Sequence, residues 1–465
     1  MTRTAVINVV GLTESLLGPA TPRLNFFLEK GKKISIVPTF PAVTCPAQST
    51  YLTGLPPAQH GIVANGWYDR ELAEVQFWKQ SDHLVQGRKI WEELREHDPN
   101  FTCAKLFWWY NMYSTADYAI TPRPIYPADG RKVFDIYTTP FSIRPEIKKD
   151  IGEFPFPTFW GPAAGVASPQ GPPEAASRWI AESGKWMETK YHPTLNLIYL
   201  PHLDYNLQRL GPSHPQISTD VRAIDEIVGG LIDFFHRQSV QVLVLSEYGI
   251  TQVDTPVHLN RIFREQGWVA IKEELGLEVL DCGASKVFAV ADHQIAHIYL
   301  NDRALEKPVR QLLEKQPGIG QLPGPTQQSA LGINHRRSGD IIALASEKAW
   351  FSYYYWLDDR LAPDFARCVD IHRKPGYDPV ELFLDPKLKL PKLKIAWRLL
   401  QKKMGLRMLM NVIPLDATLV KGSHGLRPGD PMNYPILISE NAGSLPDSSI
   451  PATSVYEIIK QQVLS

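Results

Sequence analysis

A threonine hydroxyl and an asparagine side chain stand at a spacing that could bring both to one site. They lie in the stretch 39–69, TFPAVTCPAQSTYLTGLPPAQHGIVANGWYD. Thr44 follows a short β-like run and precedes a helix-like segment, and Asn65 stands in an Asn-Gly turn that can hold its side chain back toward Thr44. Backbone N–H groups and the helix dipole favour an anion at such a strand-to-helix turn. The stretch therefore predicts phosphoryl or sulfuryl chemistry at Thr44, for which the rest of the chain must supply metal ligands.

Short apolar runs that alternate with helical patterns predict the elements that position these residues. The predicted strands are 5–10, 34–38, 195–200, 240–245 and 341–345, and the predicted helices are 88–96, 174–189 and 219–238, the last one capped by Ser218 or Thr219. This alternation is typical of a parallel α/β sheet with buried strands. Asp204 follows the third strand and Glu247 the fourth, and ligands of such sheets gather beyond the carboxyl ends of strands. The pattern therefore predicts one site formed by several strand ends.

Composition bounds the size of the protein and its partners. The 465 residues, 44% of them hydrophobic, suffice for one large domain and a smaller one. Lys plus Arg and Asp plus Glu number 49 each, which indicates no bias toward nucleic acid or an anionic membrane. Cys45, Cys103, Cys282 and Cys368 show no CxxC pairing and indicate a reducing compartment. Because no run of 18 apolar residues and no leader-like start occur, we expect a soluble, cytoplasmic protein without a transmembrane segment.

The stretch around Thr44 resembles the nucleophile region of the alkaline phosphatase superfamily, in its nucleotide pyrophosphatase/phosphodiesterase branch. That branch has Thr, an apolar residue and Pro, a helix ending in Thr-Gly, and then Pro-x-x-His-Gly-Ile-x-x-Asn. The matching positions here are Thr44, Pro46, Thr53, Gly54, His60, Gly61, Ile62 and Asn65. Taken alone, Thr44 would be interpreted as a helix cap, and the length of the match favours a nucleophile instead. The resemblance implies a mostly parallel central sheet flanked by helices, with a smaller inserted cap domain.

The family's activating metal has lost most of its ligands in this chain. The branch uses two divalent ions, usually zinc, to generate the alkoxide and bind the phosphoryl oxygens. The ion that would activate Thr44 takes Asp after the first strand and Asp-His after the fourth, where this chain has Val10 and Glu247-Tyr248. Valine cannot bind metal and an unperturbed phenol titrates near pH ~10, so only the glutamate remains. His202 and His258 are open alternatives as substitute ligands.

The second ion keeps more of its ligands. The family pattern Asp-x-x-x-His becomes Asp204 with Gln208, and Gly-x-His-Gly is retained around His424. Three such ligands with water could hold one zinc or a harder ion. The resemblance therefore implies Asp204, Glu247 and His424 as metal ligands and at most one divalent ion, with zinc as the first choice. A site without metal is the alternative.

Two regions interrupt the sheet pattern and could fold over the site. Residues 107–175 are rich in aromatics and proline, and residues 255–390 carry strand and helix signals of their own. We therefore predict a cap domain at 255–390. The rest, residues 1–254 and 391–465, is predicted to form the core, with an insertion at about 107–175.

Basic residues gather in both of these regions and beyond them. Arg123 in the first and Arg373 in the second are predicted to bind substrate, because clustered cations suit phosphate, with surface salt bridges as the alternative. The cap also contains Asp292-His293, which belongs to the same group of candidate anion-binding residues. The segment 385–404, DPKLKLPKLKIAWRLLQKKM, is basic and amphipathic. It favours a surface helix packed on the body, with membrane-surface contact as the alternative.

The resemblance implies hydrolysis of a phosphodiester or pyrophosphate bond in a phosphorylated small molecule. Thr44 would form the covalent intermediate, and Asn65 would donate to a phosphoryl oxygen. Two other functions stay open: group transfer with one metal ion or none, and non-catalytic binding of a phosphorylated metabolite or lipid intermediate. No nucleic acid partner is expected, and the leaving group, oligomeric state and pathway do not follow from these patterns.

Overall fold

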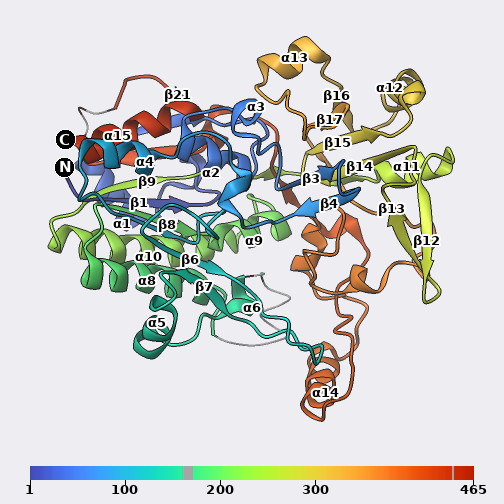
Figure 1. Cartoon of the computed structure of the whole chain (residues 1–465), viewed down its shortest axis with the longest axis horizontal. Coiled ribbons are helices and arrows are strands. Elements are labelled where there is room, and N and C mark those ends of the chain that lie inside the picture. Colours follow the sequence, from blue (N-terminus) through green and yellow to red (C-terminus); the bar gives the residue numbers. More distant parts are fainter. Residues whose placement is uncertain (160, 162–170, 442, 444) are drawn as a thin grey trace.

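A computed structural model describes residues 1–159, 161, 171–441, 443 and 445–465. Residues 160 and 162–170, part of the insertion predicted at about 107–175, lie outside the described residues. A large sheet with helices on both faces forms the core, and a smaller lobe with its own sheet lies beside it (Figure 1). We call this lobe the cap.

The core is built on a nine-stranded sheet. Its strands, in spatial order, are β21 (Ile450–Pro451), β2 (Lys32–Val37), β20 (Ile436–Ser439), β9 (Gln241–Leu245), β1 (Thr4–Val9), β8 (Leu195–Leu200), β5 (Cys103–Leu106), β6 (Tyr118–Pro122) and β7 (Ile136–Thr139). Five neighbouring pairs are parallel, and only the pairs that involve β20 or β7 are antiparallel. The central strands are buried almost throughout, as a sheet covered on both faces requires. The predicted fold class is confirmed.

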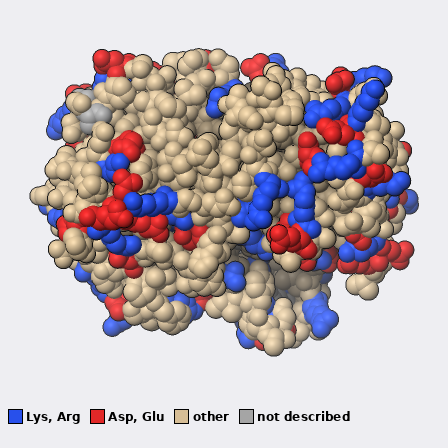
Figure 2. Space-filling model, turned by 45° about the horizontal axis from the view of Figure 1, so that its top comes forward, with Lys and Arg blue, Asp and Glu red and all other residues tan. Residues whose placement is uncertain are grey.

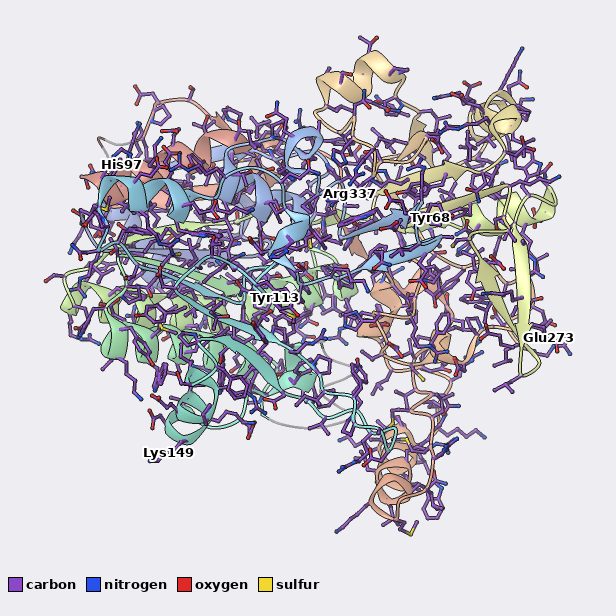
Figure 3. All side chains as sticks on the ribbon, viewed as in Figure 1. Tyr68, His97, Tyr113, Lys149, Glu273 and Arg337 are labelled. Atoms are coloured by element: carbon purple, nitrogen blue, oxygen red, sulfur yellow. The ribbon has the colours of Figure 1, made fainter. Side chains whose placement is uncertain are left out.

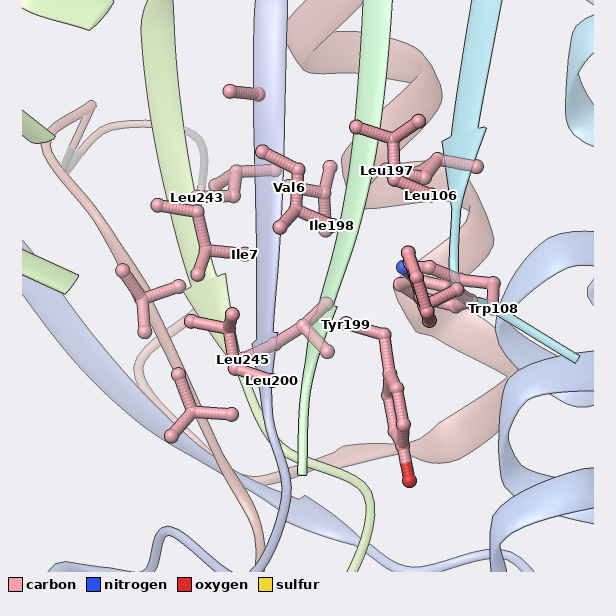
Figure 4. Close-up of a cluster of buried hydrophobic side chains, with 14 of the residues drawn as sticks. Val6, Ile7, Leu106, Trp108, Leu197, Ile198, Tyr199, Leu200, Leu243 and Leu245 are labelled. Atoms are coloured by element: carbon pink, nitrogen blue, oxygen red, sulfur yellow. The ribbon is translucent and has the colours of Figure 1, made fainter. Parts of the chain in front are cut away.

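Helices cover both faces of this sheet (Figure 1). On one face lie α1 (Pro22–Glu29), α8 (Ala175–Tyr191) and α10 (Ile217–Arg237), and on the other α2 (Thr44–Thr53), α4 (Ile90–His97) and α15 (Val455–Leu464). The other core helices are α3 (Pro57–His60), α5 (Ile143–Ile151), α6 (Phe156–Phe159) and α9 (His202–Leu210). Side chains of β1, β8, β9 and β5 meet in the buried cluster of Figure 4. Branched apolar residues on continuous strands thus fill the space between sheet and helices.

The cap is organised around a second, antiparallel sheet. This sheet contains β14 (Val287–Asp292), β15 (Ile295–Leu300), β17 (Ile341–Ala345) and β16 (Ile319–Gln321) in that order. The cap also contains the strand pairs β11 (Thr255–Val257) with β18 (Ala349–Phe351) and β12 (Ala270–Glu274) with β13 (Leu277–Asp281). Outside the cap, β3 (Gly66–Asp69) pairs with β4 (Glu74–Phe77), and β10 (Thr251–Gln252) pairs with β19 (Gly422–Ser423). The cap helices are α11 (Leu259–Glu265), α12 (Glu306–Leu313), α13 (Pro325–Ala330) and α14 (Pro391–Lys403).

The packing of the cap extends past the boundary predicted at residue 390. Ile395, Val412, Ile413 and Val420 are buried in one cluster with cap aromatics such as Trp356. The chain returns to the core only with β19, which pairs with β10 at the edge of the site. Residues 391–420, which the sequence analysis assigned to the core, therefore pack with the cap, and we define the cap as residues 255–420.

The N-terminus of one predicted helix differs in the structure. The helix predicted at 219–238 begins at Ile217, and its N-cap is Gln216 without a side-chain cap bond, so the predicted capping by Ser218 or Thr219 is wrong. The first turn of the helix thus includes Ile217 and Ser218, which the sequence pattern left outside it.

All four cysteines lie among the described residues and are free thiols. Among the described helices, none combines the length and the apolar composition needed to cross a bilayer.

Candidate active site

Thr44 begins α2 and faces a small cavity. The N-cap of the helix is Val43, whose backbone is extended and whose apolar side chain cannot act as a cap. The Thr44 hydroxyl is thus not a helix cap, and its Oγ1 lies 3.0 Å from the phenol oxygen of Tyr248. Thr44 lines a cavity of about 90 Å³ together with residues that include Tyr199 and Asp204. The hydroxyl predicted as the nucleophile therefore stands at a cavity wall.

The N-terminus of α2 offers few free backbone donors. The N–H of Cys45 donates to Asn65 Oδ1 (2.9 Å), residue 46 is proline, and the N–H of Ala47 donates to the carbonyl of Val43. The helix dipole remains. An anion next to Thr44 must therefore be held mainly by side chains, unlike the anion site that the strand-to-helix turn suggested.

Asn65 joins the start of α2 to the cap. Its Oδ1 accepts from Cys45, while its backbone N–H and its Nδ2 donate to the two oxygens of Asp292, at 2.8 and 3.1 Å. Burial raises the pKa of Asp292 to about 6, and the bond from the Asn65 N–H opposes the rise. An amide nitrogen carries two hydrogens. The bond to Asp292 therefore uses one of the two hydrogens on Asn65 Nδ2.

Tyr248 links the Thr44 hydroxyl to a carboxylate. Its phenol donates to Asp204 Oδ1 (3.1 Å), so the phenol oxygen can accept from Thr44. Burial raises the pKa of Tyr248 well above its ordinary value, which keeps the phenol protonated. Burial also raises the pKa of Asp204 to about 6, although bonds from Tyr248 and Gln208 oppose the rise. At neutral pH a hydroxyl, a neutral phenol and a mostly ionised carboxylate thus form one chain.

Glu247 is held by amides instead of a cation. Its Oε1 accepts from Asn8 Nδ2 (2.6 Å) and from Gln48 Nε2 (2.5 Å), and its buried Oε2 has no hydrogen-bond partner among the described residues. Burial raises the pKa of Glu247 to about 8, against the opposing bonds from the two amides. The carboxyl is therefore mostly protonated at neutral pH. Asn8 lies on β1, two residues before Val10. The sequence analysis did not identify it, because a single asparagine in a strand does not indicate which distant residue it will contact.

Four rings lie in a row beside this chain; two of the contacts are stacked, and His293 is tilted by 39° against His424. His424 lies between Tyr248 and His293, with ring centroids 3.7 Å from each, and His293 stacks in turn on Tyr377 at 3.8 Å. The phenol of Tyr377 donates to Gln208 Oε1 (3.0 Å), and Gln208 Nε2 donates to Asp204 Oδ2 (2.8 Å). Asp204 and Gln208 thus connect the phenol hydroxyls of Tyr248 and Tyr377, the rings at the two ends of the row.

The two histidines of the row are fixed in one tautomer. His424 Nδ1 donates to the Ala42 carbonyl (2.7 Å) and His293 Nδ1 donates to Asp292 (2.7 Å). Both Nε2 atoms are buried and have no hydrogen-bond partner among the described residues. Burial lowers the pKa of both rings well below the ordinary value, and for His424 the neighbouring His293 lowers it further. Each ring is therefore neutral, with an acceptor Nε2. The sequence marked His293 only as a candidate for anion binding.

The predicted metal ligands do not fit a metal ion in this arrangement. Within the described part of the chain, no three His, Cys, Asp or Glu side chains converge closely enough to hold one. His424 Nε2 lies 3.9 Å from Asp204 Oδ1, but Oε1 of Glu247 is already held by the amides of Asn8 and Gln48. The donor set therefore does not match the family's two-zinc site, and the phenol of Tyr248 lies where the activating ion would need a ligand.

The substitute ligands considered from the sequence lie elsewhere. His202 Nε2 is 3.6 Å from Asp220, and His258 Nδ1 contacts the Ser352 hydroxyl at 2.5 Å. Each ring has another polar neighbour, and neither histidine lines the Thr44 cavity.

A lysine also lines the Thr44 cavity. Lys374 is almost fully buried, and its Nζ lies 2.7 Å from Asp378 and 2.6 Å from Glu381. Burial alone would lower the pKa of Lys374, but the two carboxylates outweigh it and hold that pKa above its ordinary value. Lys374 is therefore charged, and it is the lysine or arginine among the described residues that line the Thr44 cavity. It follows Arg373, the predicted substrate-binding residue, by one position.

Arg123 and Arg373 line a different cleft. They share a cavity of about 350 Å³ with Lys79 and Lys132, and Trp78 is common to this cleft and the Thr44 cavity. A wider cleft of about 640 Å³ adjoins it and also contains Arg123 and Lys79. Figure 3 labels two of its lining residues, Tyr113 on the core and Arg337 near the boundary with the cap. The structure thus brings the two arginines together in a cleft whose lining does not include Thr44 and which shares Trp78 with the Thr44 cavity.

Comparison with solved structures identifies similar folds. Murine ectonucleotide pyrophosphatase/phosphodiesterase 5, in an inactive form in complex with AMP, is 14% identical with a TM-score of 0.59, over 100% of this chain and 95% of that one. Phosphonoacetate hydrolase from Sinorhizobium meliloti, in complex with phosphonoformate, is 12% identical with a TM-score of 0.60, over 99% and 96%. At these identities the likeness shows the fold alone.

Sequence comparison defines the family. An uncharacterized pyrophosphatase/phosphodiesterase of Schizosaccharomyces pombe is 25% identical over 268 residues, which are 53% of this chain and 46% of that protein. The match thus spans about half the length of that relative. The family model for type I phosphodiesterase / nucleotide pyrophosphatase matches residues 4–378, from the first strand of the core into the cap. The chain therefore belongs to the type I phosphodiesterase / nucleotide pyrophosphatase family.

Proposed function

We propose that this protein hydrolyses a phosphoric ester or anhydride bond of a phosphorylated small molecule, with Thr44 as the nucleophile. The observation that carries the proposal is the chain from Thr44 Oγ1 through the Tyr248 phenol to Asp204 Oδ1. Family membership supports phosphorus chemistry. Two structural neighbours were solved with AMP and with phosphonoformate, which supports a phosphorylated ligand here.

The residues assign a path to each proton. Thr44 Oγ1 bonds to phosphorus while its proton passes to the Tyr248 oxygen, and the Tyr248 proton passes to Asp204. The bond to the leaving group breaks, and its oxygen recovers the proton from Asp204. Water then attacks phosphorus, the bond to Thr44 breaks, and a proton from water restores the Thr44 hydroxyl. Lys374, which lines the Thr44 cavity, and the second amide hydrogen of Asn65 would stabilise phosphoryl oxygens.

Hydrolysis of bis(p-nitrophenyl) phosphate in the presence of EDTA tests this function. The wild-type protein is expected to release nitrophenol, and Thr44→Ala is expected to abolish the release. Thr189→Ala, which changes an exposed threonine on α8, is the matched control and is expected to keep full activity. Equal rates for Thr44→Ala and the wild type would contradict the proposal.

A second candidate function is non-catalytic binding of a phosphorylated metabolite or lipid intermediate. It is favoured by one observation, the protonated and amide-bound Glu247 at a position where the family places a metal ligand. In that case the wild-type protein would show no turnover, and a phosphonate analogue would bind Thr44→Ala as tightly as the wild type in calorimetry.

The compartment proposed for the protein is the cytoplasm. Free thiols at all four cysteines support a reducing environment. Burial raises the pKa of Cys45, Cys103 and Cys282, so these thiols remain protonated and unreactive. Fractionation of the source cells, with detection by antibody, tests the proposal.

A further inference from the structure

An arm of basic and apolar residues projects from the cap. We define the arm as residues 386–411, which contain α14 (Pro391–Lys403). In Figure 1 it extends away from both the core and the cap sheet. Its base is tied to the cap by the bond from the Asp385 N–H to the Val412 carbonyl (2.8 Å) and by the buried side chain of Ile395. The arm is thus attached at one end and along one face of its helix.

The apolar stripe of α14 faces solvent. Leu393, Trp397 and Leu400 recur at spacings of four and three residues, which places them on one face of the helix, and Met404 follows one residue past its end. Their side chains are 64%, 54%, 46% and 54% exposed. A helix of a globular body normally buries such a stripe, whereas the buried side chain of α14, among those the structure describes, is Ile395 on another face. An exposed apolar patch of this kind indicates a partner surface.

The charge of the arm has one sign. Residues 386–411 contain eight Lys or Arg residues and no Asp or Glu. Those that are exposed and described include Lys387, Lys389, Lys392, Lys403 and Arg407. The whole chain has a formal net charge of zero, and both signs are interspersed over the face shown in Figure 2. The arm is therefore strongly positive although the chain as a whole has no net charge.

We propose that the arm binds an anionic lipid surface. The stripe of Leu393, Trp397, Leu400 and Met404 would enter the boundary between headgroups and acyl chains, and the flanking lysines would contact lipid phosphates. A tryptophan at the centre of the stripe suits this boundary. Two copies of the arm would repel each other, because every charged side chain on both is positive. Charge complementarity thus selects an anionic membrane rather than a second copy.

The arm is close in sequence to the wall of the Thr44 cavity. Glu381 and Leu382 line that cavity, and the arm begins four residues after Leu382. The arm would therefore connect a membrane-bound helix to the segment that forms part of the cavity wall. The binding itself does not depend on chemistry at Thr44.

Flotation of the full-length protein with lipid vesicles tests the proposal. Vesicles of phosphatidylcholine with one part in three phosphatidylglycerol (about 30%, to give a strongly anionic surface) are compared with pure phosphatidylcholine vesicles. The wild type is expected to float with the anionic vesicles and to be released as salt is raised. The double variant Leu393→Glu/Trp397→Glu is expected to bind at least about tenfold more weakly, because both apolar burial and charge attraction are lost.

Phe26→Glu is the matched control. Phe26 is an aromatic residue on α1, 58% exposed, and its replacement is expected to leave vesicle binding unchanged. Circular dichroism and thermal unfolding check that each variant folds, and hydrolysis of the soluble nitrophenyl ester is expected to be the same for all of them. Equal binding to neutral vesicles, undiminished binding of the double variant, or a wild-type dimer that the double variant abolishes would each overturn the proposal.

Discussion

The rings of Tyr248 and His424 lie face to face, with centroids 3.7 Å apart and planes within 6° of each other. The stack holds the phenol oxygen between Thr44 and Asp204, at 3.0 and 3.1 Å. A tyrosine thus connects the nucleophile side of the site to the carboxylate side, in a family that brings metal ligands to these positions. The predictions below follow from this geometry and its surroundings.

Tyr248→Phe is expected to lower kcat for the nitrophenyl ester by about 10²-fold, the lower range for loss of a proton-transfer group. The substitution removes both hydrogen bonds of the phenol and keeps the stacked ring. KM is expected to change little, because the candidate donors to the phosphoryl group remain. Steady-state kinetics measure both constants, with Tyr191→Phe at the end of α8, outside the clefts described above, as the control. Unchanged kcat would remove Tyr248 from the mechanism.

Restoring the family's ligands is expected to create a zinc site. In Val10→Asp/Tyr248→His, a carboxylate and an imidazole would join Glu247 at the activating position. Elemental analysis is expected to find bound zinc in this variant, and its Tm is expected to rise on zinc addition because ligands that bind only the folded state stabilise it. Val10→Asn/Tyr248→Phe supplies the control. For the wild type, dialysis against EDTA is expected to leave the Tm unchanged, and a large drop would show that a native metal holds the fold.

His60 is expected to make the protein sensitive to acid. Its Nδ1 accepts from the Ile62 N–H (3.1 Å) and its Nε2 contacts the Thr50 hydroxyl (3.0 Å), so the neutral ring is fully bonded. Burial, and then the neighbouring His335, lower the pKa of His60 to about 3. The unfolded chain binds this proton near pH ~6.5, so the stabilisation is complete above that pH and is lost as the pH falls toward 3.

Urea unfolding between pH 7 and pH 4 measures this effect. The His60 contribution to the free energy of unfolding is expected to fall by up to about 1.4 kcal/mol per pH unit across the window. His60→Gln is expected to be less stable at pH 7 and to lose less stability on acidification. Parallel curves for the variant and the wild type would show that His60 does not take up a proton on unfolding.

Lys374→Met is expected to destabilise the protein by about 3–5 kcal/mol, because it leaves two buried carboxylates without their cation. Asp378 and Glu381 are each 6% exposed and pair with the same ammonium group. The triple variant Lys374→Met/Asp378→Asn/Glu381→Gln is expected to recover much of the loss. Urea unfolding at pH 7 compares the three proteins. If the single variant were as stable as the wild type, the triad would carry no net stabilisation.

Local signals were enough to predict much of the core. The strand at 195–200 agrees with β8 to the residue, and the run at 5–10 is displaced by one residue from β1. Continuous apolar runs of this kind can be buried only in a covered sheet, so their pattern reflects the tertiary structure. The strand at 341–345 was also correct, although it belongs to the cap sheet. An apolar run predicts that a strand is buried, but it does not predict to which sheet the strand belongs.

The sequence by itself determined the location of Thr44 and Asn65, the family and the loss of metal ligands at Val10 and Tyr248, because these depend on residue types at fixed spacing. Only the tertiary structure decided what replaces the ligands. Asn8, His293 and Tyr377 reach the site from separate strands and loops, and their hydrogen bonds and ring contacts join residues far apart in the chain. The orientation of the α14 stripe was decided in the same way, since periodicity defines an apolar face but the rest of the fold determines whether that face is covered.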